Sequence, residues 1–226
     1  MKCAVESATK FLEAICLPLA QEFGLLFRDK VYIWRLQNTI PIIKEAEKIL
    51  TKRNNCKSLY AHPRIAIKVI QEGSCVEDLN LQHMWGGLLA SSCTEDGSDE
   101  TNLIFVNILS QLSSAQARMI NYWTPESMRR FCANLPNCNP IILKASELRE
   151  ISGLSDPAIL VRELSHLGSL GLLKWATRKI RDQEEQYEIR IEDVTLRFCA
   201  RCNGYSSYMD WVRLYDRSQE NLTKQK

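Results

Sequence analysis

The chain has 226 residues, of which 45% are hydrophobic and 25% are charged, and its formal net charge is +2. This composition is typical of a folded protein and excludes an intrinsically disordered chain. A net charge so close to zero gives no overall attraction to nucleic acid or to a membrane surface. Any electrostatic preference for a partner must therefore come from charges that are segregated along the chain.

No stretch of the sequence is both long enough and apolar enough to cross a bilayer. Residues 11–19 come nearest, but Glu13 and Pro18 interrupt them. A secretory signal peptide is not expected either, because Glu6 and Lys10 fall where an apolar region would be needed. The sequence therefore predicts a cytoplasmic protein with no membrane span.

The first part of the chain is predicted to form a series of amphipathic helices. Apolar residues recur at helical spacing over residues 12–26 and again over residues 29–52. Pro18 is predicted to kink or break the first of these helices, and Pro41 to bend or restart the second. A short helix is then expected to run from residue 64 to residue 70.

The next predicted helix contains an unusual pair of glycines. Ser74 and Glu77 match the S-x-x-E capping box, in which the two side chains satisfy free backbone amides at a helix start. Trp85 lies on the apolar face of this helix, followed by Gly86 and Gly87. Each glycine costs about 1 kcal/mol relative to alanine. Either another backbone packs closely against this helix, or the helix is soft.

Three further helices are expected before the chain changes character. The first covers residues 102–111, and Ser113 with Gln116 repeats the capping-box pattern for the second. Thr124 and Pro125 are predicted to start a separate third helix, since proline is favoured at the first helical position. A loop rich in proline and asparagine follows before Ile141.

After Pro140 the sequence predicts strands as well as helices. The expected elements are a strand at residues 141–143, a helix at 147–152, a turn at Gly153, a helix from about 157 to 169, strands at 174–180 and 186–192, and a helix at 194–202. Helix, turn, helix and β-ribbon in this order is the layout of a winged helix.

The predicted fold is therefore mainly α, with an N-terminal multi-helix domain and a C-terminal winged-helix-like module that carries a small β-hairpin. The expected boundaries are residues 1–123 for the helical domain, 124–140 for a linking helix and loop, 141–204 for the winged-helix-like module, and 205–226 for a C-terminal helix and tail. Trp211 and Leu214 are expected to face inward from that last helix.

Three blocks of the sequence resemble a known bacterial family. They are Trp34 to Leu50, Pro63 to Ile70 with Glu77 to Ala90, and Phe105 to Ile120. In these blocks the chain is similar to the Abi-alpha (abortive infection alpha) family, a family of unknown function. The resemblance is good over residues 20–125 and looser beyond. Its most specific part is the stretch that contains Gln82, Trp85 and the paired leucines.

This resemblance implies a bacterial protein linked to phage defence through altruistic growth arrest or death. It implies no reaction, because the family has no agreed catalytic residues. The chain departs from the usual block at Gly86 and Gly87, where a small residue followed by a polar one is expected. That departure bears on the rigidity of the helix.

The cysteines and histidines do not form a recognisable reactive or metal-binding pattern. The nine cysteines are an odd number and are predicted to be reduced thiols. Cys199 and Cys202 form a CxxC motif, but they lie in a predicted helix. The possible partner pair, Cys132 and Cys138, is spaced too widely for a zinc site. The histidines are isolated in sequence, so we predict no metal and no cofactor.

Charges are strongly segregated in the first half of the sequence. Every charged residue from Lys48 to Lys68 is basic, and every charged residue from Val69 to Ala117 is acidic. This pattern predicts a basic side and an acidic side, which would form an anionic or self-complementary contact surface. Solvated faces that happen to cluster would explain the same pattern.

The predicted winged-helix-like module is electrically neutral, with ten basic and ten acidic residues between Ile141 and Asn203. Its predicted recognition helix carries Asp156, Arg162 and Glu163, a poor match for DNA phosphates. The sequence therefore favours a protein partner over nucleic acid. The alternative is a winged-helix DNA-binding transcriptional regulator. The residues that would lie at DNA in that case are Arg162, His166, Arg178 and Lys179.

The sequence thus predicts a bacterial abortive-infection (phage-defence) protein that acts through protein contacts with itself or with a phage or host factor. It is not expected to be an enzyme, although a toxin enzyme with an unrecognised site is a third alternative. The residues predicted to bind a partner are Arg35, Gln37, Asn38, Gln82, Trp85, Arg162 and His166.

Overall fold

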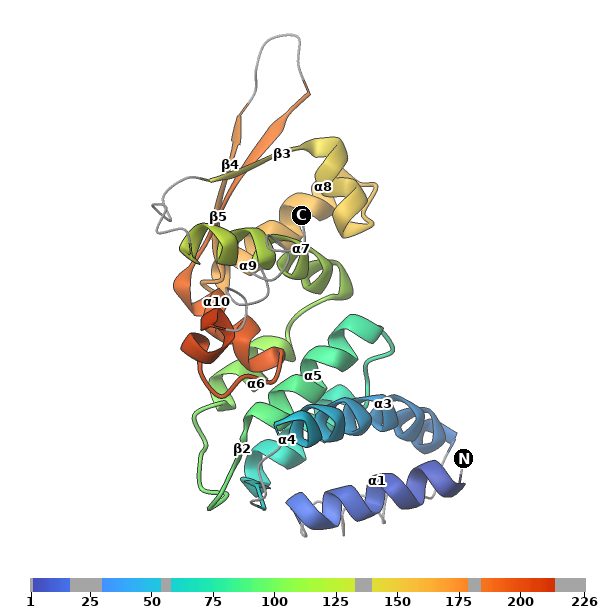
Figure 1. Ribbon diagram of the computed structural model, residues 1–226. Helices are drawn as coiled ribbons and strands as arrows, with labels where there is room; N and C mark the ends of the chain where they lie inside the picture. The colour runs from blue at the N-terminus through green and yellow to red at the C-terminus, as the bar shows by residue number, and fades with distance from the viewer. Residues whose placement is uncertain (1, 17–29, 54–57, 133–139, 179–183, 214–226) are drawn as a thin grey trace, which may run out of the picture. The chain divides into compact units, whose positions relative to one another are not determined.

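The computed structural model describes residues 2–16, 30–53, 58–132, 140–178 and 184–213. Helices dominate these residues, together with small antiparallel sheets, so the prediction of a mainly helical fold is confirmed (Figure 1). The chain divides into two compact units. Unit 1 comprises Met1–Gln111 and Ala200–Ser206, and unit 2 comprises Leu112–Cys199 and Ser207–Lys226. Within the described ranges, no helix has the length and apolar character to span a membrane.

Unit 1 is built around one apolar helix. Its elements are α1 (Lys2–Ile15), α3 (Lys30–Lys52), α4 (Pro63–Gly73), α5 (Leu79–Ser91) and α6 (Leu103–Leu109), with short strands β1 (Tyr60–Ala61) and β2 (Cys93–Thr94) paired antiparallel. α5 packs against α3, α4 and α6 and buries side chains on all sides, as expected for a central helix. α3 continues through Pro41, while Pro18 lies outside the described residues.

The predicted capping box at the start of α5 is wrong, because a neighbouring aspartate caps the helix instead. The Asp78 carboxylate accepts hydrogen bonds from the backbone amides of Asn80 and Leu81, at 3.0 and 3.1 Å. Ser74 follows the end of α4, and its amide donates to the Ile70 carbonyl. The Glu77 carboxylate accepts from the Trp34 indole and is thereby drawn toward α3.

The glycine pair in α5 lies where other backbone segments approach closely. A Cβ atom on Gly86 would lie 2.7 Å from the Ile42 carbonyl oxygen in α3. A Cβ atom on Gly87 would lie 1.8 Å from the carbonyl oxygen of Cys202. Real Cβ atoms do not approach backbone this closely, so close backbone packing accounts for the two glycines.

Unit 2 combines helices with a three-stranded antiparallel sheet. Its elements are α7 (Ser114–Cys132), β3 (Ile141–Lys144), α8 (Ala145–Ser152), α9 (Pro157–Ser169), β4 (Leu173–Arg178), β5 (Gln186–Ile191) and α10 (Asp193–Cys202), which enters unit 1 after Cys199. β5 lies between β3 and β4. The strands and helices predicted after Pro140 are present, with ends shifted by a few residues at most.

The helix starts in unit 2 are predicted correctly in one case and wrongly in another. The capping box at α7 is confirmed: the Ser113 amide donates to Gln116 Oε1 at 3.0 Å, and the Gln116 amide donates to Ser113 Oγ at 3.3 Å. No separate helix starts at Thr124, because α7 runs through Pro125. Met128 is fully buried beyond the proline, and this packing favours continuing the helix over breaking it.

The core of unit 2 lies between the sheet and the helices. The buried face of the sheet presents Leu143, Leu173, Tyr187 and Ile189, and the helices contribute Leu148, Leu160, Leu164 and Leu167. A second cluster packs Met128, Leu196 and Val212 with the partly buried Trp211. Trp211 lies in a helical stretch at residues 208–213, as predicted, and Leu214 lies outside the described residues.

Candidate functional site

Two of the predicted binding residues hold the end of α4 against α3. Arg35 donates from Nε to Ser74 Oγ at 2.8 Å and from Nη2 to the Gln71 carbonyl at 3.1 Å. Asn38 Nδ2 donates to the Ser74 carbonyl at 3.0 Å. Asn38 is only 7% exposed, so this bond satisfies a buried carbonyl that has left the helix ladder.

Gln82 and Trp85 lie on α5, which follows the turn after α4. Gln82 is buried, and its Nε2 donates to the Val76 carbonyl at 2.8 Å. Trp85 is 1% exposed and lies beside Gly73, where an added Cβ would come within 3.2 Å of the indole. The structure therefore gathers four of the seven predicted residues around the turn between α4 and α5. The hydrogen bonds of Arg35, Asn38 and Gln82 and the burial of Trp85 stabilise this turn.

We expect the buried amide of Asn38 to contribute more to stability than its exposed neighbour. Asn38→Ala should lower the free energy of unfolding by about 1–3 kcal/mol, because it leaves the buried Ser74 carbonyl without its donor. Gln37 is exposed on the same helix, so Gln37→Ala should change it by less than about 0.5 kcal/mol. Urea unfolding followed by circular dichroism measures both, and equal effects would contradict this role.

The remaining two predicted residues belong to a polar network in unit 2. Gln116 Nε2 lies 3.2 Å from the Glu163 carbonyl and 2.8 Å from His166 Nδ1. Ser113 Oγ donates to Glu163 Oε2 at 2.8 Å, and Arg162 Nη2 donates to Glu163 Oε1 at 2.7 Å. The network ties the start of α7 to the middle of α9. Arg162 nevertheless keeps 71% of its side chain exposed.

Glu163 is a nearly buried carboxylate that remains ionised. Burial by itself would raise its pKa, but hydrogen bonds from Arg162 and Ser113 and the charge of Arg162 lower the pKa below the ordinary value of 4.5. A carboxyl group with a lowered pKa in the folded state stabilises the fold above its unfolded pKa. That stabilisation is lost as the pH falls through the lowered value.

Unit 2 should consequently lose stability in acid through Glu163. We expect the melting temperature to fall as the pH drops below about 4.5, and to fall less steeply in Glu163→Gln, which has no charge to lose. Differential scanning calorimetry between neutral and acidic pH measures this. Since Asp96 and Asp99 in unit 1 also have lowered pKa values, some acid sensitivity should persist in the variant. Identical pH profiles for the two proteins would refute the assignment.

Two of the described cysteines are buried thiols with raised pKa values. Burial raises the pKa of the Cys93 thiol to about 12, and burial likewise raises the pKa of Cys199 to about 12. Both thiols are therefore protonated at neutral pH, and the thiolate is the reactive form. Cys75 is exposed, and Cys138 lies outside the described residues. In the part of the chain that the structure describes, no cluster of three histidine, cysteine or carboxylate side chains could hold a metal ion.

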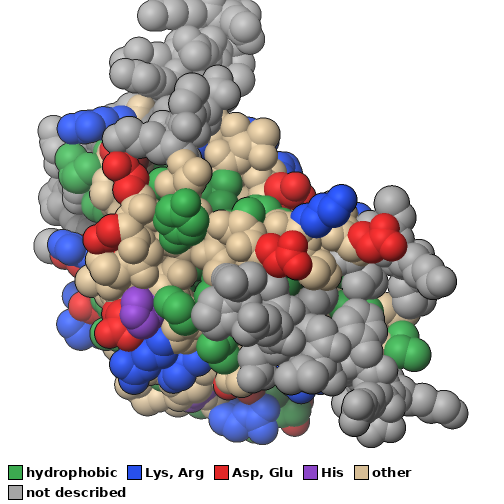
Figure 2. Space-filling view, turned by 90° about the horizontal axis from the view of Figure 1, so that it is seen from below, with side chains coloured by type: hydrophobic (Ala, Val, Ile, Leu, Met, Phe, Trp, Pro, Cys, Tyr) green, Lys and Arg blue, Asp and Glu red, His purple; other side chains and the backbone are tan. Residues whose placement is uncertain are grey.

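Folding brings the segregated charges of the first half together. Arg64, from the basic segment, lies 3.5 Å from Glu100 of the acidic segment, and His62 lies 3.5 Å from the same carboxylate. Lys68 donates to the Asn107 side chain. On the face of the molecule in Figure 2, acidic and basic side chains are intermingled and the hydrophobic ones are scattered. Segregation along the sequence thus does not become segregation in space at these contacts.

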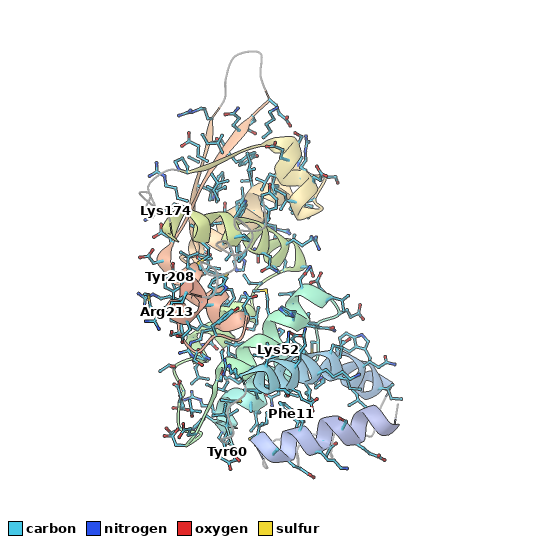
Figure 3. The ribbon with its side chains drawn as sticks, viewed as in Figure 1. Phe11, Lys52, Tyr60, Lys174, Tyr208 and Arg213 are labelled. Atoms are coloured by element: carbon cyan, nitrogen blue, oxygen red, sulfur yellow. The ribbon has the colours of Figure 1, made fainter. Side chains whose placement is uncertain are left out.

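Four basic side chains on the surface of unit 2 are paired with carboxylates. Besides Arg162, which pairs with Glu163, three further ion pairs join neighbouring elements: Arg149–Glu184 at 3.5 Å, Lys174–Glu192 at 3.0 Å and Arg178–Glu188 at 3.0 Å. Lys174 lies on β4 near the end of the ribbon that is away from its tip (Figure 3). Part of the balance between acids and bases in the sequence is thus realised as local ion pairs.

A shallow open depression lies at the turn between α8 and α9. Arg149, Gly153, Leu154 and Ser155 line it. Gly153 has a φ of 71°, which favours glycine, and Arg118 donates to the Ser152 carbonyl beneath it. The depression is too open to exclude water from a reaction.

Sequence reasoning missed the partners that give these residues their roles. The S-x-x-E pattern predicts that Ser74 and Glu77 cap α5, whereas in the structure both residues contact α3. Arg162 donates to the adjacent Glu163, which also accepts a hydrogen bond from Ser113. The one sequence signal for this network is the capping box formed by Ser113 and Gln116. That box places Ser113 where its hydroxyl reaches α9.

The fold thus defines a mainly helical protein of two compact units with small antiparallel sheets. The family model described as abortive infection alpha (Abi-alpha) matches residues 35–208, which is most of the chain and includes much of both units. The chain belongs to the Abi-alpha family. No curated protein and no solved structure matches it.

Proposed function

We propose that this chain is a bacterial phage-defence protein that acts in abortive infection through protein contacts made by unit 2. Membership of the Abi-alpha family supports the link to abortive infection. The protein-contact mode rests on the charges of unit 2. In this proposal residues 1–123 form a helical domain, residues 124–140 link it to a winged-helix-like module at 141–204, and a C-terminal helix and tail follow.

The order of elements in unit 2 supports the winged-helix-like module. β3 precedes α8, a left-handed turn at Gly153 leads to α9, and the antiparallel ribbon of β4 and β5 follows. In modules of this layout the second helix of the helix–turn–helix pair is the recognition element, which here is α9. α7 precedes the module in sequence, but it belongs to unit 2 and packs against α8 and α9.

The observation that carries the protein-contact mode is the pairing of basic side chains on α9 and β4. Arg162 is the one basic residue among the exposed positions of α9, and Glu163 holds it at 2.7 Å. On β4, Lys174 and Arg178 are each held by a carboxylate at 3.0 Å. Binding to duplex DNA depends on basic side chains that neutralise phosphates, and these carboxylates compete with phosphates for the same cations.

The same geometry suits a protein partner. Glu163, itself fixed by Ser113, orients the exposed Arg162 before any partner arrives, so little side-chain entropy is lost on binding. Arginine is among the residues enriched in protein interfaces. Ala158 and Ser165 are also exposed on α9 and are small enough to let a partner approach the helix. The partner would be a second copy of the chain or a phage or host factor.

A phage-challenge assay with a bulky charged substitution on α9 tests this proposal. Ser165→Arg adds a cation to the exposed side of α9, which would obstruct a protein partner but favour DNA. We expect cells that express the wild-type chain to form fewer phage plaques, and Ser165→Arg to abolish that protection. Ser110→Arg, the same change at an exposed serine in unit 1, is the control and should retain protection. Protection that survives or improves in Ser165→Arg would contradict the protein-contact mode.

A further inference from the structure

The three-stranded sheet of unit 2 has an outer face that no described element covers. Because side chains alternate along a strand, the residues between the buried ones all point to this face. Its principal residues are Ile142, Lys144, Lys174, Arg178, Glu188 and Arg190. Ile142 is 50% exposed, which is unusual for an isoleucine on a sheet. We call these residues the outer sheet face.

The strand register arranges the outer sheet face in three rows. In one end row, Lys144 and Arg178 flank Gln186, and in the other, Arg190 lies opposite Lys174. The middle row contains Ile142, Glu188 and Ala176. Successive rows on one face of a sheet are about 7 Å apart. Two basic rows therefore lie on either side of a row that is apolar at both edges.

The basic rows carry more positive charge than their neighbours neutralise. Glu192 and Glu188 pair with Lys174 and Arg178, but neither the Lys144 ammonium nor the Arg190 guanidinium forms an ion pair with a carboxylate among the residues that the structure describes. Arg190 also lies directly opposite Lys174, and like charges in that position destabilise a sheet. The fold thus keeps basic side chains on both sides of the middle row, and one of these rows places two like charges opposite each other.

We propose that the outer sheet face binds an extended acidic segment of a partner protein, with the pattern acid, any residue, apolar, any residue, acid. An extended peptide also presents every second side chain to one side, so its spacing matches the rows. Its carboxylates would meet Arg190 and Lys144, and its apolar side chain would cover Ile142. Phosphates fit less well, because Ile142 in the middle row offers them no favourable contact. This inference rests on the protein-contact mode proposed above.

Nuclear magnetic resonance titration tests the inference directly. The isotopically labelled full chain is titrated with a short synthetic peptide of the pattern Glu-Thr-Leu-Thr-Glu, with a Lys-Thr-Leu-Thr-Lys peptide, and with a duplex DNA oligonucleotide. We expect the acidic peptide to shift the amide signals of β3, β4 and β5. The lysine peptide should leave them unchanged.

Charge-reversal variants test whether the basic rows of the outer sheet face bind the peptide. The double variant Lys144→Glu with Arg190→Glu should weaken peptide binding by roughly tenfold or more, since each attraction becomes a repulsion. Arg197→Glu, which reverses one exposed arginine on α10 away from the sheet rows, is the control and should bind as the wild type does. An equal loss in Arg197→Glu would overturn the assignment, because any reduction in net charge would then suffice.

The remaining outcomes separate this inference from the proposed function. If the peptide shifts no sheet signals, the outer sheet face is not a docking surface, whereas the Ser165→Arg challenge still decides the protein-contact mode. If duplex DNA shifts the same signals at lower concentration than the peptide, both ideas are wrong.

Discussion

Replacing Gly87 by alanine is expected to destabilise unit 1 by about 3 kcal/mol or more. The added Cβ would lie 1.8 Å from the Cys202 carbonyl oxygen and 2.5 Å from its carbonyl carbon. Both are backbone atoms, so no side chain can rotate to make room. Either α5 or the end of α10 must move, and that movement would disturb the buried residues around Leu88 and Leu89.

Gly168→Ala provides a matched control for this substitution. Gly168 also lies within a helix, but a Cβ atom there would approach other atoms no closer than 3.7 Å, which is ordinary contact. Alanine should therefore be neutral or stabilising by up to about 1 kcal/mol at that position. Urea denaturation monitored by circular dichroism compares the two variants. Equal stabilities for Gly87→Ala and the wild type would show that the end of α10 does not pack closely against α5.

Truncating Trp85 should have the second large effect, a loss of about 3–5 kcal/mol of unfolding free energy. The indole is 1% exposed at the centre of unit 1, so alanine would leave a large cavity beside Gly73 and Ile42. Tyr122 is 55% exposed, and Tyr122→Ala should cost less than about 0.5 kcal/mol. Thermal unfolding followed by circular dichroism is suitable, because it does not depend on the tryptophan that is removed.

The Trp85 variant also separates a structural role from a binding role. If Trp85 acts only in the core, a Trp85→Phe variant that still folds should protect against phage as the wild type does. A well-folded Trp85→Phe protein that gives no protection would contradict this interpretation and would restore Trp85 as a binding residue.

Much of the fold follows from local patterns that the sequence displays openly. The periodicity of α3 and the alternation in β4 and β5 predict those elements, because burial on one face imposes the pattern. The cap at Ser113 was also predictable from two residues. Local rules failed where distant contacts decide the outcome. Thr124 and Pro125 suggest a helix start, but burial of Met128 keeps α7 continuous.

The candidate surfaces were less predictable, because they depend on pairing between elements that are distant in sequence. A count of acids and bases predicts a neutral module, but only the register shows that Lys174 faces Arg190 while Lys144 has no described carboxylate partner. Similarly, Arg35 and Asn38 could be selected as polar residues of interest, but only the fold reveals that both donate to Ser74.

The interaction with duplex DNA tests the protein-contact mode most directly. Fluorescence anisotropy of a labelled duplex should be measured against the full chain at low salt and again at increasing salt. We expect no saturable binding at any salt concentration, because carboxylates already hold the cations of α9 and β4. Saturable binding at low salt that weakens steeply as salt is added, and that is lost in Arg178→Glu, would contradict the account.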